Sequence, residues 1–158
     1  MPQVKRAELH YLELLNTICL AEGRAGTYLK FWADKTAAPE LKACLALVAA
    51  RETSHYDVFK RRIEELGYTV QEKEDPGFKE RLRVLGSDMT DIEKIRWQQA
   101  SQQRQQQSPT LRERYEAAIS DETIDPLTRS LLRWFADEEA DSRGLLAEAY
   151  ASVEAKAR

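Results

Sequence analysis

The chain has 158 residues, a formal net charge of −3 and an apolar fraction of 42%. This length is typical of one domain with its own hydrophobic core, so we expect a single domain over residues 1–158. The acidic balance argues against a nucleic-acid partner held by bulk positive charge. The sequence contains no apolar stretch long enough for a membrane span, and residues 1–8 lack the apolar core of a signal peptide. We therefore expect a cytoplasmic protein without a membrane partner.

Glycine and proline are scarce in this sequence. Together they make up about 7% of the residues, whereas average usage is about 12%. A β-sandwich or a small barrel needs more tight turns than this composition supplies, so the sequence favours a few long helices. Two cysteines cannot form a disulfide scaffold, and two histidines limit any metal site to two imidazole ligands.

The first half of the chain predicts two helices. Apolar residues that recur with a helical period indicate a helix over about residues 3–35. Pro39 suits the first turn of a second helix, which the pattern carries to Gly67. Because only a short turn separates the two, we expect an antiparallel hairpin over about residues 3–67.

The second half predicts a connection and another hairpin. Residues 68–89 are mixed and charged, and we expect a long crossover that includes a short helix. Ser87 or Thr90 can cap a third helix, and a fourth begins near Pro126 and runs to the end of the chain. These two helices form the second hairpin, over about residues 90–156.

The two hairpins resemble each other in sequence. Shifting the chain by 87 residues without gaps aligns seven identical residues within a 25-residue window. The matched pairs are Tyr28/Tyr115, Asp34/Asp121, Thr36/Thr123, Pro39/Pro126, Leu45/Leu132, Ala49/Ala136 and Glu52/Glu139. A repeated helical hairpin joined by a long crossover predicts an all-α, antiparallel four-helix bundle.

A Glu-x-x-His motif lies on the second predicted helix. Glu52 and His55 are three residues apart, so their side chains project from one helical face. A carboxylate on that apolar face needs a salt bridge or a metal ion to offset its desolvation. Glu22 lies level with the motif in a hairpin that turns near residue 37, and the 87-residue shift carries the same face to Glu139. We therefore predict a metal site formed by Glu22, Glu52, His55 and Glu139.

With these residues the chain resembles the ferritin-like superfamily, nearest to the rubrerythrin and bacterioferritin branch. The resemblance spans the four predicted helices and rests on Glu22, the Glu52-x-x-His55 motif and Glu139. In that superfamily each hairpin supplies one Glu and one Glu-x-x-His, and the two sets hold a di-iron or di-manganese centre. The resemblance implies chemistry with oxygen, peroxide or iron itself, and a homodimer by analogy.

The second hairpin departs from the family pattern. Pro109 stands at the shifted position of Glu22, and Ser142 stands at that of His55. The resemblance therefore implies a degenerate second half-site and one ion, held asymmetrically by three carboxylates and one imidazole. These donors suit iron or manganese, and also zinc. The sequence carries no haem or nucleotide signature and no Cys-rich iron domain, so redox chemistry would need an external electron donor.

Two substitutions could restore ligands to the second half-site. A register shift of one residue would offer Glu138 and Asp141 in place of Glu139 and Ser142. Glu113, one turn beyond the proline, could move into the place of the lost first-helix ligand. Neither change recreates the family motif, and the apolar row around Glu139 favours that residue as the inward one.

The third predicted helix is rich in glutamine. Residues 98–107 read QQASQQRQQQ and are followed by Ser108 and Pro109. Proline interrupts helical hydrogen bonding, so we expect a kink or a restart with Ser108 and Pro109 as N-cap and first-turn pair. Gln102 or Gln106 could line a polar pocket at the lost half-site, or the segment could be solvated and partly disordered.

Three functions fit the sequence. The favoured one is a metalloprotein, with oxygen- or peroxide-linked oxidoreductase chemistry. The alternative is a non-catalytic bundle that keeps a vestigial site, with His55 bonded to Glu22, and that acts in dimerisation or partner binding. The third is a hydroxylase for an organic or nucleic-acid substrate in the glutamine-rich pocket, and the net charge of −3 disfavours the nucleic acid. His10 lies about 18 Å from Glu22 along the predicted helix, too far to join the site in any of them.

Overall fold

The computed structural model describes residues 9–158, which form six helices and no strand. This part of the chain is all-α, as the composition predicts. The helices are α1 Leu12–Lys35, α2 Pro39–Glu65, α3 Pro76–Leu85, α4 Asp91–Arg104, α5 Leu111–Ile119 and α6 Pro126–Lys156. Among the described residues, no helix combines the length and the apolar character that a membrane crossing requires.

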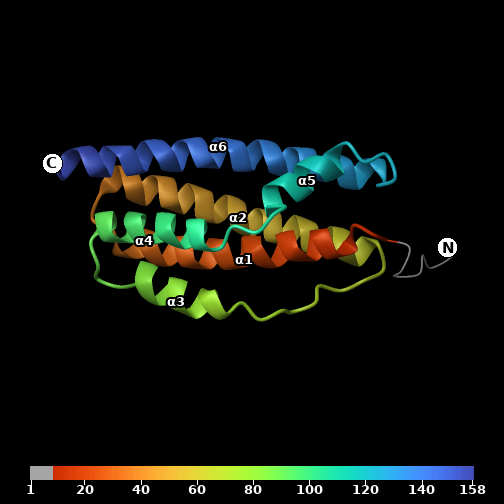
Figure 1. The fold of residues 1–158 in the computed structure, drawn as a ribbon, viewed down its shortest axis with the longest axis horizontal. Coiled ribbons are helices and arrows are strands. Elements are labelled where there is room, and N and C mark those ends of the chain that lie inside the picture. Colours follow the sequence, from red (N-terminus) through yellow and green to blue (C-terminus); the bar gives the residue numbers. More distant parts are fainter. Residues whose placement is uncertain (1–8) are drawn as a thin grey trace.

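The three long helices run along the long axis of the molecule, with α2 packed against both α1 and α6 (Figure 1). The shorter α4 and α5 follow one another along the same axis. Figure 1 shows α4 toward the end that holds the C-terminus and α5 toward the opposite end, and both pack on α6. Helix α3 lies against α1 on the outside of this group.

The first hairpin is tightly packed where the two helices carry small residues. A Cβ atom on Gly26 of α1 would lie 2.7 Å from Thr53 Oγ1 and 3.3 Å from the backbone oxygen of Ala49. A Cβ atom on Gly23 would lie 2.8 Å from the ring of Tyr56. A side chain at either position would force Thr53, Tyr56 or the α2 backbone to shift, so the two glycines favour the close approach of α1 and α2 next to Glu22 and Glu52.

The observed start of α1 and end of α2 can be compared with the helix ends predicted from the sequence. The predicted helix start near residue 3 lies outside the described residues, but residues 9–11 form a turn, so the helix begins later than expected, at Leu12. The end at Gly67 is confirmed. Gly67 has a φ of 92°, and the N–H groups of Gly67 and Tyr68 donate to the carbonyl oxygens of Glu64 and Ile63.

The predicted third helix is two helices. Thr90, rather than Ser87, caps α4, because its hydroxyl accepts from the N–H of Glu93 while the Glu93 carboxylate accepts from the N–H of Thr90. Helix α4 ends at Arg104, and α5 begins after a non-helical segment that contains Pro109. The expected restart is confirmed, but Ser108 and Pro109 do not form the cap. Thr110 is the N-cap of α5.

A polar layer divides the hydrophobic core into two clusters. One lies where α1 begins and α2 ends, and includes Leu15, Ile18, Phe59, Leu132 and Phe135. The other lies around the α1–α2 turn, and includes Trp32, Leu41, Leu45, Leu85 and Ile95. On each of the three long helices the two apolar stretches are separated by buried polar residues, which are Glu22 on α1, Glu52 and His55 on α2, and Ser142 on α6.

Candidate metal centre

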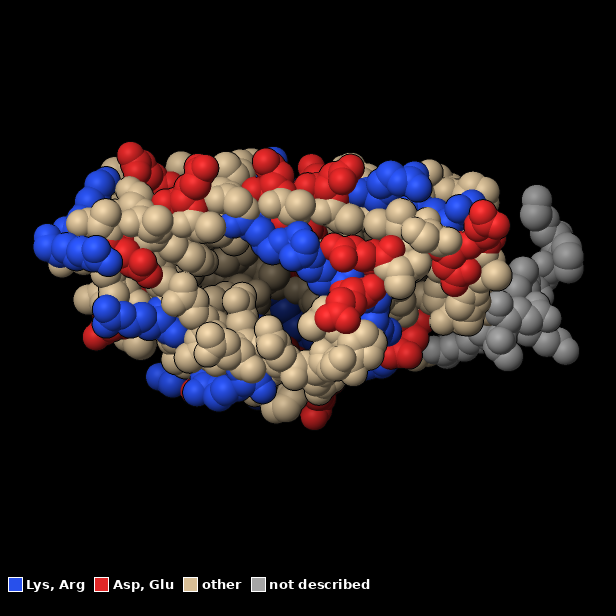
Figure 2. Space-filling model, turned by 45° about the horizontal axis from the view of Figure 1, so that its top comes forward, with Lys and Arg blue, Asp and Glu red and all other residues tan. Residues whose placement is uncertain are grey.

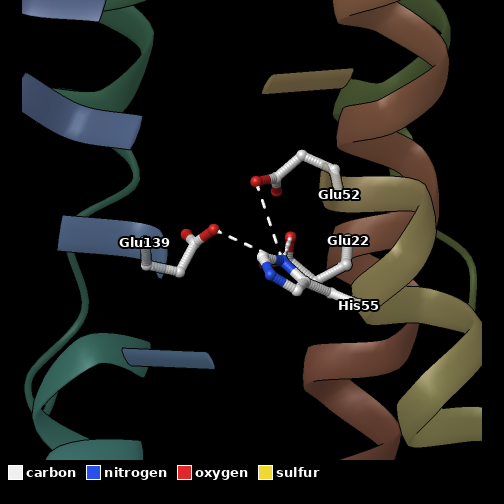
Figure 3. Close-up of side chains that lie close together, drawn as sticks. All are labelled: Glu22, Glu52, His55 and Glu139. Carbon is white, nitrogen blue, oxygen red and sulfur yellow. Dashed lines mark hydrogen bonds and ion pairs between the residues drawn. The ribbon is translucent and has the colours of Figure 1, made fainter. Parts of the chain in front are cut away.

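Four side chains from three helices meet in the polar layer (Figure 3). Glu22 comes from α1, Glu52 and His55 from α2, and Glu139 from α6, and one ligand atom from each lies within 4.8 Å of the other three. The Nδ1 atom of His55 is 3.3 Å from Glu22 Oε2, 3.6 Å from Glu139 Oε1 and 3.9 Å from Glu52 Oε1. The structure thus brings together the four residues that the sequence singled out.

The cluster is buried and short of positive charge. The side chain of His55 is fully buried, and those of Glu22, Glu52 and Glu139 are 6%, 7% and 19% exposed. Within the described part of the chain, His55 is the one basic side chain at ion-pair distance from these three glutamates. Glu139 Oε1 is buried and has no hydrogen-bond partner among these residues. A buried carboxylate oxygen in this state is costly unless a proton or a cation compensates it.

Protons provide that compensation in the metal-free chain. Burial raises the pKa of Glu22 to about 8 and the pKa of Glu139 to about 8. Burial, together with the neighbouring carboxyl of Glu22, raises the pKa of Glu52 to about 9. At neutral pH these carboxyls hold protons that an ordinary glutamate would have released. A metal ion would bind by replacing those protons.

Glu138 contacts the opposite side of the imidazole. Its Oε1 lies 2.8 Å from Nε2 of His55, and its side chain is 31% exposed. Because a carboxylate only accepts hydrogen bonds, a proton on Nε2 satisfies this contact, and in the neutral tautomer that carries it the lone pair of Nδ1 faces the three buried carboxyls. The rings of Trp134 and Phe135 meet the imidazole edge to face, each with a centroid distance of 5.0 Å. The imidazole is therefore fixed in one orientation.

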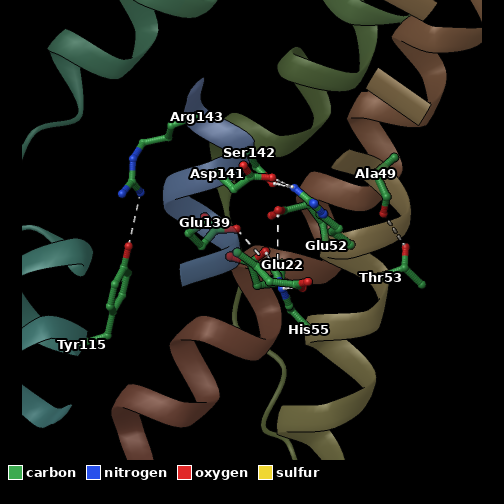
Figure 4. A network of polar contacts seen from close by, with 12 residues as sticks. Glu22, Ala49, Glu52, Thr53, His55, Tyr115, Glu139, Asp141, Ser142 and Arg143 are labelled. Carbon is green, nitrogen blue, oxygen red and sulfur yellow. Dashed lines mark hydrogen bonds and ion pairs between the residues drawn. The ribbon is translucent and has the colours of Figure 1, made fainter. Parts of the chain in front are cut away.

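The structure does not bring the register-shifted pair, Glu138 and Asp141, into the cluster. Glu138 lies outside the four-residue cluster, and Asp141 is 59% exposed and forms an ion pair with Arg51 at 2.8 Å. Ser142 is buried in its place and accepts a hydrogen bond from Arg51 at 3.1 Å (Figure 4). The apolar row along α6 turns Glu139 inward, so the register inferred from that row is the observed one.

Two other polar residues stay away from the cluster. Glu113 does not join the cluster, because it is exposed in the first turn of α5, where its backbone N–H donates to the hydroxyl of Thr110. His10 lies before α1, where its Nε2 atom is 3.2 Å from Asp121 Oδ2. The sequence analysis excludes His10 from the site because of its distance from Glu22 along the predicted helix, and the observed position of His10 agrees with that exclusion.

A cavity of about 590 Å³ opens beside the cluster, between α4 and α6 (Figure 2). Glu52, Glu139 and Ser142 line one part of it, and Gln98 and Gln102 line another. Gln102, one of the two glutamines that the sequence offered as pocket residues, therefore lines a cavity beside the cluster. Residues 102–109 are exposed, and Gln106 lines an adjoining cavity of about 600 Å³ that shares Tyr28, Gln98 and Gln102 with the first.

Sequence reasoning missed two of these contacts. It considered Glu138 as a substitute ligand and did not predict its contact with His55, although Glu139 was assigned to the inward face, which leaves the adjacent residue at the edge of that face. It also did not predict that Gln98 is buried, with 6% of its surface exposed. Ile95, one turn earlier on α4, is a buried apolar residue that marks the same face.

Comparisons with protein-family models, with curated proteins and with solved structures each give no match. The function of the chain therefore has to be inferred from its own residues. Those residues form a buried carboxylate and imidazole group that could hold a metal ion.

Proposed function

We propose that the chain is a ferritin-like metalloprotein in which Glu22, Glu52, His55 and Glu139 hold one ion. The observation that carries the proposal is the orientation of His55. Its Nδ1 atom faces three buried carboxyls, while its Nε2 atom is bonded to Glu138 at 2.8 Å. Metal-ligating histidines are held in this way, with one nitrogen on the metal and the other donating to a carboxylate or carbonyl.

The charge of the cluster supports a divalent cation. Three carboxylates carry three negative charges when ionised, and the buried Glu139 Oε1 has no hydrogen-bond donor among the described residues. Carboxylate and imidazole ligands suit iron(II), manganese(II) and zinc(II). Iron or manganese would supply redox chemistry with oxygen or peroxide at this position. The chain itself would hold the ion, orient His55 through Glu138 and cover the site on two sides with the hydrophobic clusters.

The helix arrangement supports a bundle with one incomplete half. Helices α1 and α2 form a hairpin that supplies Glu22, Glu52 and His55, whereas α4, α5 and α6 supply only Glu139. The segment between α4 and α5 is not helical at Pro109, which is where a partner of Glu22 would stand. We therefore propose one ion rather than a symmetric pair. A homodimer, an external electron donor and a cytoplasmic location stay predictions from the sequence.

An anaerobic titration with Fe(II) or Mn(II) tests the proposal, with elemental analysis of the desalted protein. The parent should retain one equivalent, and His55→Ala should bind at least about 100-fold more weakly because it loses the one imidazole ligand. His10→Ala is the matched control, because that histidine lies with Asp121 away from the cluster. Loss of metal by the parent, or equal binding by His55→Ala, would overturn the proposal.

The second candidate is a non-catalytic bundle with a vestigial site. It is favoured by one observation, which is that both nitrogens of His55 have partners without any metal, Glu22 at 3.3 Å and Glu138 at 2.8 Å. Such a protein would have the same melting temperature before and after chelation. The metalloprotein should instead lose thermal stability when a chelator removes its ion, because a ligand that binds only the folded state stabilises it.

A further inference from the structure

The cavity of about 600 Å³ that Gln106 lines has basic residues in its wall and no acidic ones among the described residues. It is bounded by side chains from α1, α3, α4 and α5. Its charged residues are Arg81, Arg112 and Arg114, whereas the chain as a whole carries a net charge of −3. None of the four residues of the proposed metal centre lines it. The arginines therefore set the charge of this cavity, which favours an anionic ligand.

Arg81 is the arginine of this cavity that lacks a carboxylate. The Nε atom of Arg112 lies 2.9 Å from Glu116 Oε1. The Nη2 atom of Arg114 lies 3.8 Å from Glu13 Oε1. Arg81 is half-buried, and no carboxylate of residues 9–158 lies at ion-pair distance from it. A charged side chain that leaves water is usually paired, so the Arg81 guanidinium is suited to an anion from solution.

The guanidinium of Arg81 is held in place by neutral groups. Its central carbon lies 5.1 Å from the centroid of the Tyr28 ring. Its Nη2 atom donates to Ser101 Oγ at 3.2 Å and to Gln105 Oε1 at 3.3 Å. Its other nitrogens, Nε and Nη1, have no acceptor among the described residues. Arg81 thus combines a fixed position with unused donors, and the planar guanidinium matches the oxygens of a carboxylate or a phosphate.

The remaining wall of the cavity is rich in groups that bond to hydroxyls. Gln98 is 6% exposed, and its Oε1 atom has no donor among the described residues. A glutamine amide both donates and accepts, as a hydroxyl does. At the start of α5 the N–H groups of Leu111 and Arg112 have no acceptor among the described residues, and such free groups favour an anion. The glutamines that line the cavity are Gln98, Gln102, Gln105, Gln106 and Gln107.

We propose that this cavity binds a small hydroxylated oxyanion, a sugar acid or a sugar phosphate, with its carboxylate or phosphate on Arg81 and a hydroxyl donating to Gln98. The volume of about 600 Å³ lies within the usual range for small-molecule sites. Arg81 bonds to Ser101, one helical turn from Gln98 on α4, so a six-carbon molecule is long enough to contact both. The site does not depend on the metal centre, because the two share no residue.

Isothermal titration calorimetry tests the proposal with gluconate, glucose 6-phosphate, glucose and inorganic phosphate. At least one of the two sugar anions should bind at least about tenfold more tightly than glucose, because a hydrogen bond to a charged group contributes more than a neutral one. Inorganic phosphate should bind more weakly than glucose 6-phosphate, because it cannot reach Gln98. The comparison of gluconate with glucose 6-phosphate identifies the anionic group. The affinities should be the same in the protein as purified and after treatment with a chelator.

Two variants of the anion end locate the site, each with a matched control. Gln105→Glu places a carboxylate on Arg81 at an exposed position, so it should weaken binding of the sugar anion at least about tenfold. Gln103→Glu adds the same charge at an exposed position of α4 that lines neither cavity, and should bind like the parent. Arg81→Met keeps an apolar side chain on Tyr28 without the guanidinium and should weaken binding to the same extent. Arg83→Met, on the exposed side of α3, is its control.

A further variant tests the hydroxyl end of the ligand. Gln98→Leu removes the acceptor, so it should weaken binding of the sugar anion and leave binding of inorganic phosphate unchanged. Loss of binding for both anions in a folded Gln98→Leu would contradict the assigned hydroxyl contact.

Several results would overturn the proposal. They are equal affinity for glucose and both sugar anions, no binding of either anion at millimolar concentration, and binding by Gln105→Glu that matches the parent. Binding that disappears after chelation would show that the anion binds through a metal ion and not at Arg81. Metal uptake is measured separately, and a parent protein that retains no metal would overturn the proposed function while leaving these expectations for the anion unchanged.

Discussion

His55 on α2 and Glu138 on α6 meet at 2.8 Å between Nε2 and Oε1. This contact joins the first hairpin to the last helix from the outer side of the polar layer. It also fixes which nitrogen of the imidazole faces Glu22, Glu52 and Glu139. In the proposed metal centre the acidic residue next to Glu139 would therefore position His55 rather than bind the ion.

Replacing Glu138 should weaken metal binding without abolishing it. Glu138→Ala frees Nε2 and lets the imidazole rotate, so we expect a loss of about 10–100-fold in metal affinity, with one equivalent still bound at saturation. Asp137→Ala, at the exposed neighbouring position, is the control and should bind like the parent. Complete loss in Glu138→Ala, as in His55→Ala, would show that Glu138 is a ligand.

The metal-free protein should lose stability as the pH rises from about 5 to about 8. In the unfolded chain the three glutamates release their protons near pH 4.5, whereas in the folded chain the pKa is about 8 for Glu22, about 9 for Glu52 and about 8 for Glu139. Between these values the folded state binds more protons than the unfolded state, so the free energy of unfolding decreases with pH. Thermal unfolding of chelator-treated protein at several pH values measures the trend, and a melting temperature that rises over this interval would contradict it.

Removing one buried carboxyl should stabilise the metal-free protein and abolish metal binding. Glu52→Gln keeps the shape of the side chain but cannot ionise, so at pH 8 it should stabilise the metal-free protein by about 1 kcal/mol or more. The same variant should lose metal binding. Glu64→Gln, an exposed position on the same helix, should change neither property. Denaturant unfolding with and without Mn(II) distinguishes the variants, and a destabilised Glu52→Gln that still binds metal would refute this view of the cluster.

Asp125 should contribute to stability far from the centre. As the N-cap of α6 it accepts from the N–H of Thr128, the hydroxyl of Tyr11 and the guanidinium of Arg62 at 2.7–2.9 Å. Partial burial raises its pKa, but these bonds outweigh burial and lower the pKa to about 2. Asp125→Ala should therefore cost about 2 kcal/mol at neutral pH.

The pH dependence of this contribution has the opposite sign to that of the centre. The pKa of Asp125 is lowered in the folded state, so its contribution is complete above the ordinary value of 3.8 and is lost as the pH falls toward 2. Asp121→Ala is the control, because Asp121 also has a pKa of about 2 but lies on the surface with Thr123. An equal loss of stability in both variants, measured by denaturant unfolding at pH 7, would contradict the role of the cap.

Local signals account for what the sequence predicts correctly. Pro39, Gly67 and Pro126 act within one turn of their own backbone, so they mark the helix ends without knowledge of the rest of the fold. The level of Glu22 opposite the Glu-x-x-His motif follows from the short turn and from the rise of an α-helix. The 87-residue shift then adds Glu139, so residue spacing alone is enough to select the four members of the cluster.

The remaining features depend on contacts between distant elements. Thr110 is an exception, because its hydroxyl accepts from the N–H of Glu113 three residues later, and this Thr-x-x-Glu pattern is a local cap signal that the choice of Ser108 overlooked. To predict the contact between Glu138 and His55, one must know how α6 is rotated about its own axis relative to α2, to within a fraction of a turn. The burial of Gln98 requires a cavity, and a cavity is a property of several helices at once.

The most direct test of the central claim is anomalous diffraction from crystals of the protein loaded with Mn(II) or Fe(II), measured at the absorption edge of the metal. We expect one peak per chain, within bonding distance of Glu22, Glu52, Glu139 and the Nδ1 atom of His55. A second peak of equal height in the cavity beside Glu52 and Glu139 would contradict the single-ion centre. The absence of any peak among these four residues in metal-loaded crystals would contradict the metalloprotein itself.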